Sequence, residues 1–358
     1  MQRQLRITCY FLLITFSFSC TPETPQSVRS PYQTIFYIYR FDPPALLEFS
    51  EEFQVIDEVP FSLPPNCGLF NTFPAPVGKF MAIELSCPNG QMVLLLDTDT
   101  FSIIQPIRDS DGHFLSWAPG GKSIYLKADS FGTPHVARVY TDGAIDLIPI
   151  SEFTYDLASS ANNREFLFTF SSGLGQGSEL WLAKDDGRIA QQLYADQFNY
   201  ISFARYSPDG TQIAFIKIPD TGTPFTVGEL WVMDKDGSNI RKLADVDAGH
   251  GYAANWSPDG KKIAFVVREN PEDERANQSS EALISNIYVV EVDSRKLNPI
   301  TNFIEARVET PAWSPDGNTL AFNVVLNDRM EVQIADLTTG EIRSLSAEST
   351  CCPAWIQK

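Results

Sequence analysis

The sequence predicts an all-β protein, a β-propeller of four-stranded antiparallel blades, from three observations. First, the segment "WSPDGKKIAF" at 256–265 returns almost unchanged as "WSPDGNTLAF" at 313–322. Second, a third clear copy begins at Tyr206 and weaker ones extend the series toward the N-terminus, at intervals of roughly 42 to 57 residues, close to the length of a propeller blade. Third, the chain beyond its N-terminal segment shows no helical periodicity of apolar residues.

The first nineteen residues are predicted to be a signal peptide. The segment "MQRQLRITCYFLLITFSFSC" at 1–20 has two arginines, then an apolar run from Ile7 to Phe18, then small residues before Cys20. A charged region, a short hydrophobic region and a cleavage region in this order are typical of export signals. The apolar run is too short to span a bilayer. We therefore expect an extracytoplasmic protein, in the periplasm or at the cell surface.

Two processing routes remain open at Cys20. Ser17 and Ser19 suit ordinary signal peptidase, whereas Cys20 resembles the lipidated cysteine of a bacterial lipoprotein, with Ser17 in place of the usual leucine. We expect lipidation at Cys20 and therefore attachment to a membrane. Residues 20–31, with the Pro-, Ser- and Thr-rich stretch "TPETPQSVRSP", are then an extended tether. Residues 32–358 form one β-propeller domain.

Each blade follows one pattern. A first strand ends at an aromatic residue, and Ser-Pro-Asp-Gly then makes a tight turn because proline presets φ and glycine accepts a positive φ. An apolar second strand follows, such as the one that begins at Lys262. A third strand, such as "ELWVMD" from Glu229, and a short fourth strand, such as "IRKLA" from Ile240, complete the unit.

The two ends of the chain are expected to share a blade. The chain stops at "CCPAWIQK", which matches "TPAW" at 310–313 and supplies only an innermost strand. The missing strands are found near the N-terminus, in "SPYQTIFYIY" from Ser30, "ALLEF" and "FQVID". Pairing the last strand with the first ones removes two exposed sheet edges. This arrangement predicts seven blades, with six as the alternative.

The repeats resemble those of the TolB family of periplasmic proteins and of the propeller domains of prolyl-oligopeptidase-type peptidases. The resemblance extends over nearly all of residues 31–358 and rests mainly on the copies at 206, 256 and 313. The chain has no separate N-terminal α/β domain, which departs from TolB. It also has no G-x-S-x-G nucleophile elbow and no region large enough for a hydrolase domain, which departs from the peptidases.

Composition bears on the partners. The chain has 43% hydrophobic and 12% aromatic residues, enough for a large core. Its net charge of −18 arises from scattered acids without a basic stripe, so nucleic acid is not an expected partner.

The sequence lacks the common motifs for phosphate and zinc. "GGKS" at 120–123 lacks the earlier glycine of a phosphate loop, and no CxxC pair or HExxH motif occurs. We expect no cofactor and no metal.

Four cysteines remain after Cys9 and Cys20. Cys67 falls at the start of a first strand and Cys87 at the end of the antiparallel second strand, so we expect a disulfide between them. Cys351 and Cys352 are adjacent. They could pair with each other, stay as thiols, or reach into the neighbouring blade.

A ligand site is expected at one mouth of the central channel, where the innermost strands begin. Residues a few positions before each blade's aromatic converge there: Asp111, His113, Tyr155, Tyr200, His250, Tyr252, Arg307, Glu309 and Cys351. In this hypothesis Arg307 binds an anion, and His250 and the tyrosines form hydrogen bonds. The alternative is a solvent-filled channel mouth that binds no ligand. A polar insertion from Arg268, "RENPEDERANQSSEALIS", is a second candidate surface.

Two functions follow from these observations. The one that the sequence favours is a non-catalytic propeller at the membrane surface that binds a protein or peptide, with a small-molecule ligand as a variant. The other is a lyase or hydrolase that acts on an acidic sugar or peptide at the channel mouth. Uronate lyases with similar repeats depend on a metal and several convergent histidines, and only His113 and His250 are expected near the mouth.

Overall fold

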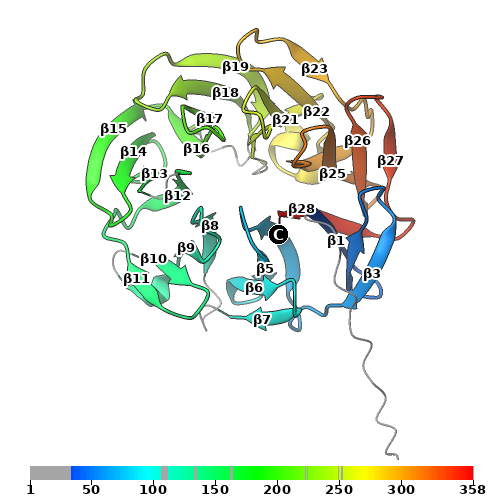
Figure 1. The fold of residues 1–358 in the computed structure, drawn as a ribbon. Helices are drawn as coiled ribbons and strands as arrows, with labels where there is room; N and C mark the ends of the chain where they lie inside the picture. Colours follow the sequence, from blue (N-terminus) through cyan, green and yellow to red (C-terminus); the bar gives the residue numbers. More distant parts are fainter. Residues whose placement is uncertain are drawn as a thin grey trace, which may run out of the picture.

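Seven four-stranded antiparallel sheets form a closed ring around a central channel in the computed structural model (Figure 1). The structure describes residues 34–105, 112–132, 135–161, 164–221, 223, 225–248, 250 and 253–357. Within these ranges the helical turns are three short 3-10 helices, η1 (Asp129–Phe131), η2 (Glu274–Asn277) and η3 (Ser280–Ala282). No helix of the described part is long and apolar enough to cross a membrane. The predicted signal peptide and tether, with Cys20, lie outside the described residues.

Each blade runs from an innermost to an outermost strand. The first three complete blades consist of β4 (Gly68–Pro74), β5 (Phe80–Cys87), β6 (Gly90–Asp97) and β7 (Ser102–Ile104); β8 (His113–Trp117), β9 (Ser123–Lys127), β10 (Val136–Tyr140) and β11 (Ile145–Leu147); and β12 (Thr154–Ser159), β13 (Glu165–Phe170), β14 (Ser178–Lys184) and β15 (Ile189–Asp196). The next three consist of β16 (Asn199–Tyr206), β17 (Gln212–Pro219), β18 (Val227–Asp234) and β19 (Arg241–Asp247); β20 (Asn255–Trp256), β21 (Lys262–Arg268), β22 (Ser285–Glu291) and β23 (Leu297–Pro299); and β24 (Arg307–Trp313), β25 (Thr319–Leu326), β26 (Arg329–Asp336) and β27 (Ile342–Ser344).

The seventh blade contains both ends of the described chain. Its strands are β28 (Thr350–Gln357), β1 (Thr34–Arg40), β2 (Ala45–Phe49) and β3 (Val55–Pro60), in this order from the channel outward. Strand β28 pairs antiparallel with β1, and Figure 1 shows this C-terminal strand on the inner side of the blue N-terminal strands. The predictions of seven blades and of a shared closing blade are confirmed.

The repeated Ser-Pro-Asp-Gly segments are the turns that the sequence predicts. In the copy after β16, Ser207 donates its hydroxyl to Asp209 at 2.6 Å, and the Gly210 amide donates to the Ser207 carbonyl at 2.8 Å. Gly210 has a φ of +70°, which glycine adopts without steric cost. The copy after β20 repeats the hydroxyl–carboxylate bond between Ser257 and Asp259 at 2.6 Å. Each turn therefore fixes where one blade's second strand begins.

The core lies between neighbouring blades. The phenylalanine of the repeated "AF" step is at most 1% exposed in three successive blades, at Phe215, Phe265 and Phe322. These rings and the aliphatic residues of adjacent strands form clusters that each combine two blades. Burial of such side chains contributes roughly 1.5–3 kcal/mol each, so blade-to-blade packing holds the ring together.

The four cysteines form two disulfides in the structure. Cys67, just before β4, is bonded to Cys87 at the end of β5. Cys351 and Cys352 at the beginning of β28 are bonded to each other, which is the first of the three alternatives left open above. Both pairs lie in or against one apolar cluster between the closing blade and the first complete blade.

Replacing Cys67 and Cys87 by serine is expected to destabilise the protein by about 3 kcal/mol. The bond closes a loop with a sequence separation of 20 residues, and removing it frees that loop in the unfolded chain. Urea denaturation of the double serine variant under oxidising conditions measures the loss. Recovery of both cysteines as free thiols in peptide mapping without reduction would contradict the pairing.

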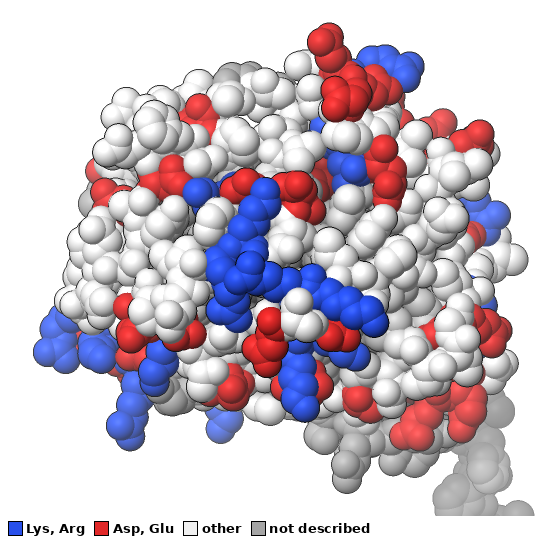
Figure 2. All heavy atoms as spheres, turned by 90° about the horizontal axis from the view of Figure 1, so that it is seen from above, with Lys and Arg blue, Asp and Glu red and all other residues white. Residues whose placement is uncertain are grey.

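Charged side chains of both signs are scattered over the outer side of the ring. Figure 2 shows a group of Lys and Arg side chains near the middle of this side, with Asp and Glu beside it, and further charged side chains of both signs toward the edges. Among the outer-strand ion pairs, Lys242 contacts Asp245 at 2.6 Å and Glu229 at 2.8 Å. The hydrogen bond to Asp245, followed by that to Glu229, raises the pKa of Lys242 above its ordinary value. Solvent-exposed pairs of this kind add little stability.

Candidate functional site

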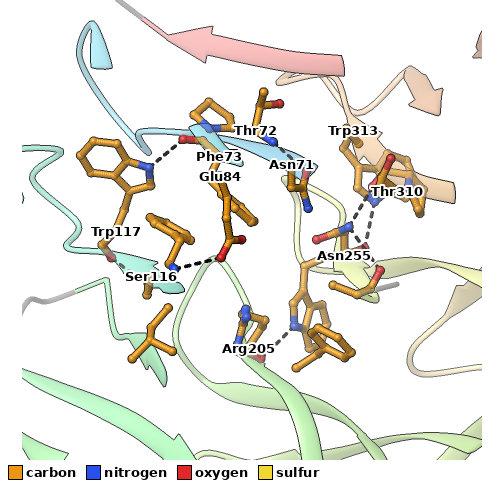
Figure 3. A pocket seen from close by; sticks show the side chains of 18 of the residues that line it. Asn71, Thr72, Phe73, Glu84, Ser116, Trp117, Arg205, Asn255, Thr310 and Trp313 are labelled. Atoms are coloured by element: carbon orange, nitrogen blue, oxygen red, sulfur yellow. Dashed lines mark hydrogen bonds between the residues drawn. The ribbon is translucent and has the colours of Figure 1, made fainter. Parts of the chain in front are cut away.

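A cavity of about 690 Å³ occupies the central channel (Figure 3). The innermost strand of every blade contributes to its wall, and Glu84 enters from the second strand β5. The volume lies within the range of about 300–1,000 Å³ that is usual for ligand pockets. Phe70, near the beginning of β4, lines the cavity and is 60% exposed, so solvent reaches the cavity there.

β-Bulges shape the wall of this cavity. The pairing register between first and second strands shifts in the blades that begin with β4, β8, β12, β16, β24 and β28. Residues skipped by these shifts line the cavity: Phe70, Leu115, Tyr155, Phe203, Thr310, Pro311 and Pro353. A bulge bends its strand and re-aims a side chain, and bulges are frequent beside functional sites. The ring of bulges thus turns a row of strand residues into a lined pocket.

Three of the bulged residues have a left-handed backbone. Phe203 has a φ of +55°, the β-branched Thr310 a φ of +49° and Cys352 a φ of +65°. Such values are unfavourable for these residue types and persist where the surroundings enforce them. Asn323 provides such a support, since its amide donates to the Thr310 hydroxyl at 3.1 Å and its carbonyl accepts from the Cys352 amide at 3.0 Å. Asn323 thereby joins the bulges of two neighbouring blades.

The wall is predominantly aromatic. Nine rings line it: Phe70, Phe73, Phe114, Trp117, Tyr155, Phe203, Trp256, Trp313 and Trp355. Three of the indoles are held by the same contact, because each donates to a carbonyl of the preceding blade's innermost strand. Trp117 donates to Phe73 at 2.8 Å, Trp256 to Arg205 at 3.2 Å and Trp313 to Asn255 at 3.0 Å. These bonds fix flat apolar surfaces around the channel, on which a ligand can stack.

Arg205 and Asp156 form an ion pair in the wall. The Arg205 Nη1 donates to both oxygens of Asp156, at 2.9 and 3.0 Å. The Ala204 amide also donates to Asp156 at 3.2 Å. Since Asp156 lies on β12 and Arg205 on β16, the pair ties adjacent innermost strands together and leaves the two charges balanced.

Glu84 is the other charged residue of the wall, and its side chain is 6% exposed. Its Oε1 accepts a hydrogen bond from the Phe114 amide at 3.3 Å and lies 3.8 Å from the His113 Nδ1. Burial raises the pKa of Glu84 to about 7, against an opposing effect of the Phe114 hydrogen bond. The cavity therefore holds a carboxyl group that titrates near neutrality.

Glu84→Gln is expected to be more stable than the wild type at alkaline pH, and this advantage is expected to shrink as the pH falls. The folded-state pKa of Glu84 lies above its ordinary value of 4.5, so its contribution to stability is fully present below pH 4.5 and is lost as the pH rises through about 7. The loss at pH 8 is about 3 kcal/mol in the wild type, and the neutral glutamine avoids it. Urea denaturation of both proteins at pH 5, 6, 7 and 8 measures the difference. A difference that stays constant across this range would contradict the expectation.

The structure separates the predicted mouth residues into several groups. Tyr155 lines the cavity, and its hydroxyl donates to the Ile201 carbonyl at 2.6 Å. Burial raises the pKa of this hydroxyl to about 12. The Tyr200 ring lies 6.1 Å from the Tyr155 ring in an edge-on arrangement. Arg307 is held by its neighbour Glu309 at 2.6 Å. Of the predicted mouth residues that the structure describes, Tyr155 is the one that lines the cavity.

The two histidines lie in different surroundings. The His113 side chain is 53% exposed and lies beside Glu84, whereas the His250 side chain is 2% exposed and lies beside Asp247. Asp111 and Tyr252 are outside the described residues. Within the described residues no three His, Cys, Asp or Glu side chains are grouped so that they could hold a metal ion.

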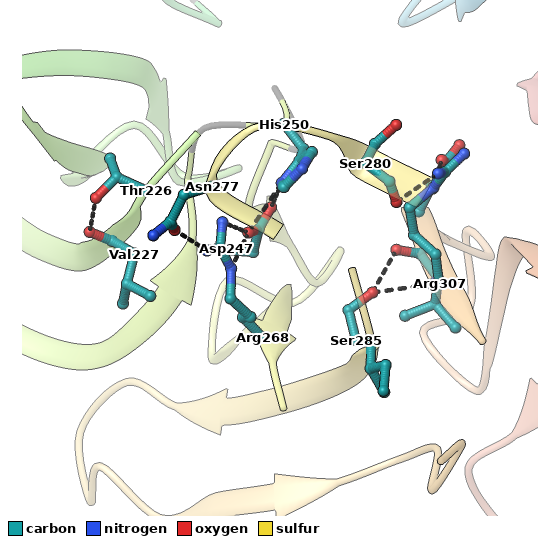
Figure 4. A network of polar contacts seen from close by, with 12 residues as sticks. Thr226, Val227, Asp247, His250, Arg268, Asn277, Ser280, Ser285 and Arg307 are labelled. Atoms are coloured by element: carbon teal, nitrogen blue, oxygen red, sulfur yellow. Dashed lines mark hydrogen bonds and ion pairs between the residues drawn. The ribbon is translucent and has the colours of Figure 1, made fainter. Parts of the chain in front are cut away.

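The insertion after β21 is tied down at its base by a polar network (Figure 4). Arg268 donates to Asp247 at 2.8 Å and to Asn277 of η2 at 2.7 Å. Arg307 donates to the Ser280 carbonyl of η3 at 2.7 Å. The predicted loop is thus a structured element that contacts the strands on either side of it.

Sequence reasoning missed the residues that line the cavity apart from Tyr155. Glu84 lies on a second strand, where the repeat pattern predicts only packing. Asp156 and Arg205 fall within innermost strands of mixed polar and apolar residues, where no pattern sets them apart. One sequence feature does mark the bulges: Pro311 and Pro353 precede the tryptophan by two positions, and a proline inside a strand indicates a bulge.

Comparisons with known proteins agree with this fold. Residues 210–356 match the family model of the TolB beta propeller domain, which confirms the predicted resemblance for that part. No curated protein matches the sequence. A structure of TolB from Acinetobacter baumannii is 18% identical, covers 88% of this chain and 79% of its own, and has a TM-score of 0.51.

Two enzymes share the fold as well. An oligogalacturonate lyase in complex with manganese is 14% identical, with 86% of this chain and 83% of its own covered and a TM-score of 0.56. A prolyl endopeptidase is 8% identical, with 87% and 48% covered and a TM-score of 0.60. Because a TolB protein, a lyase and a peptidase all match at such low identities, these similarities establish the fold alone.

Proposed function

We propose that this propeller is a non-catalytic binding protein that acts outside the cytoplasm and holds a peptide segment of a protein partner in its central cavity. The observation that carries the proposal is the ring of bulged innermost strands, which directs aromatic side chains into one cavity of about 690 Å³. Flat rings and nearby backbone groups suit an extended peptide, because they offer stacking surfaces and hydrogen bonds together.

The exposed apolar side chains on one face of the ring favour a macromolecular partner. The loops between blades and the loops between second and third strands lie on the face where the innermost strands begin, which we name the entry face. Six large apolar side chains in these loops or at their edges are exposed: Phe41, Phe153, Leu174, Phe198, Ile304 and Leu326. Phe198 is 78% and Ile304 77% exposed. A partner that enters the cavity from this face would cover them.

The alternative of an enzyme for acidic sugars receives less support from the lining. An acidic sugar would place its carboxylates near Glu84, and Arg205 is already paired with Asp156 at 2.9 Å. Like charges in a low-dielectric cavity repel, so the wall disfavours a polyanion.

Filling the cavity tests the proposal. Peptides selected from a random phage-displayed library on the wild type are expected to lose at least about tenfold in affinity on Ser202→Trp, which places an indole in the cavity. Ser294→Trp, on the exposed turn between β22 and β23, is the matched control and should bind as the wild type does. Equal binding to both variants would show that the peptides bind outside the cavity. A failure to select any peptide would overturn peptide binding.

We further propose that Cys20 is lipidated and anchors the protein to a membrane. The apolar run from Ile7 to Phe18 followed by small residues supports export, and the Pro-rich stretch after Cys20 supports a tether. Acyl chains would supply a strong apolar anchor. Cys20→Ser is expected to move the protein from the membrane to the soluble fraction. Mass spectrometry that finds an unmodified Cys20 at the mature N-terminus would reject lipidation.

A further inference from the structure

We propose that the Glu84 side of the cavity is a subsite for a cationic group, an alkylammonium or guanidinium, such as the side chain of a lysine or arginine in a bound peptide. This inference rests on the proposed function and names the chemistry that the same cavity selects. It concerns one carboxylate and the aromatic rings next to it.

The charges of the wall point to a cation. Three acidic or basic side chains line the cavity, namely Glu84, Asp156 and Arg205. Arg205 donates to both oxygens of Asp156, at 2.9 and 3.0 Å, so its charge is already balanced. Glu84 therefore leaves the wall with a net negative charge when it is ionised. A ligand cation would balance this charge.

Glu84 also has room for a further hydrogen bond. Its Oε1 accepts from the Phe114 amide at 3.3 Å, while the His113 Nδ1 at 3.8 Å lies beyond hydrogen-bond distance. A carboxylate has acceptor sites for about four hydrogen bonds. The Glu84 side chain is only 6% exposed, so few of these sites reach bulk water. An ammonium or guanidinium donor in the cavity would supply a further partner.

The rings beside Glu84 suit a cation as well. Phe114, whose amide donates to Glu84, stacks on Phe73 with ring centroids 4.2 Å apart, and the Trp117 ring packs against Phe114 with its centroid at 6.4 Å. All three line the cavity. The face of an aromatic ring attracts a cation, most strongly where water is excluded. Carboxylate and rings thus favour the same type of ligand group.

The raised pKa of Glu84 agrees with this assignment. Its cause is burial, which penalises the ionised carboxylate. A bound cation compensates for that penalty, whereas a neutral apolar group does not. The competing explanation is that Glu84 only supports the Phe114 amide. Glutamine retains a carbonyl acceptor for that amide, so Glu84→Gln separates the two roles.

The experiment compares matched peptides on matched variants. Each peptide selected on the wild type is synthesised with its lysine or arginine and again with norleucine, which keeps the alkyl chain and removes the charge. Calorimetry is expected to show a loss of about 10- to 100-fold with norleucine on the wild type and less than about twofold on Glu84→Gln. Glu291→Gln, at the end of strand β22 and outside the cavity, changes the net charge equally and should behave as the wild type does.

The possible results separate this inference from the proposed function. Peptides that bind in the cavity without a cationic residue, or an equal norleucine loss on Glu84→Gln, would overturn the cation subsite and leave peptide binding intact. If no peptide binds, titration with n-butylammonium decides. Saturable binding to the wild type that Glu84→Gln abolishes would retain the subsite for a small amine, and no binding would overturn both proposals.

Discussion

Removal of the last strand, β28 (Thr350–Gln357), is expected to lower the melting temperature by more than about 15 °C or to prevent folding. The strand is the innermost one of the closing blade and pairs with β1 along its length, from Thr34 opposite Gln357 to Arg40 opposite Thr350. Its Ile356 is fully buried, and its Trp355 ring packs on Phe36 at 4.3 Å.

The size of this effect follows from what the deletion exposes. Each large apolar side chain that loses its burial costs roughly 1.5–3 kcal/mol, and the contacts that β28 makes with two neighbouring blades are lost as well. The Thr72 hydroxyl, for example, donates to the Cys352 carbonyl from the next blade at 3.2 Å. The total approaches the whole stability of an ordinary domain, which is about 5–15 kcal/mol.

Differential scanning calorimetry of the protein truncated after Ser349 measures the change. A synthetic peptide of residues 350–358 added to the truncated protein should restore part of the loss, because it can pair with the free edge of β1. A scrambled peptide of the same composition is the control. A truncated protein that melts like the full chain would show that the ring does not depend on this closure.

The repeated turn explains why the fold was predictable. The geometry of Ser-Pro-Asp-Gly is set by contacts within the turn. The Ser207 hydroxyl donates to Asp209 at 2.6 Å, and Gly210 adopts a φ of +70°. A local pattern of this kind counts the blades and sets the four strands of each. The incomplete last repeat then requires partners from the N-terminus, and β1, β2 and β3 are those partners.

The candidate site was less predictable because bulges alter the count along each innermost strand. The sequence hypothesis places the ligand-facing residues a few positions before each blade's aromatic residue. A bulge adds a residue to one strand of the pair and re-aims the side chains beside it, so Phe70 and Thr310 line the cavity where a regular strand would direct them otherwise. Tyr155 belongs to both sets because it is itself the bulged residue of β12.

Glu84 illustrates a second limit of prediction from sequence. It lies on β5 opposite Asn71, within a strand whose other central residues are buried and apolar. In the sequence alone, it resembles one polar residue in an otherwise hydrophobic strand. Its closeness to Phe114, thirty positions later, arises from the packing of one blade on the next. The carboxylate becomes part of a site only through that tertiary contact.

Asp247→Ala is expected to destabilise the protein by about 3–5 kcal/mol, because it leaves a buried arginine without its carboxylate. The side chains of Asp247, Arg268 and His250 are 0%, 1% and 2% exposed. Two nitrogens of Arg268 donate to one Asp247 oxygen at 3.0 and 2.8 Å, and the His250 Nδ1 lies 2.8 Å from the other. Alanine would remove the carboxylate that two nitrogens of this buried guanidinium bind and would leave it the Asn277 side chain, at 2.7 Å, as a hydrogen-bond acceptor.

The midpoint of urea denaturation gives the global cost, and hydrogen exchange gives the local one. Exchange should rise most in the insertion between β21 and β22, because Arg268 links its η2 helix to the end of β19. Arg188→Ala is the control, since it breaks an exposed ion pair with Asp186 and should leave the midpoint unchanged. An unchanged midpoint in Asp247→Ala would mean that water or another group compensates for the lost carboxylate.

A double variant decides whether the loss comes from an uncompensated charge. Removing both partners, as in Asp247→Leu with Arg268→Met, eliminates the buried cation together with its carboxylate, and such replacements are often neutral for stability. We therefore expect the double variant to recover most of the free energy of unfolding that Asp247→Ala loses. If the double variant is as unstable as the single one, the packing of His250 against the Phe225 ring, whose centroid lies 4.3 Å away, is what Asp247 maintains, and the charge of Arg268 is secondary.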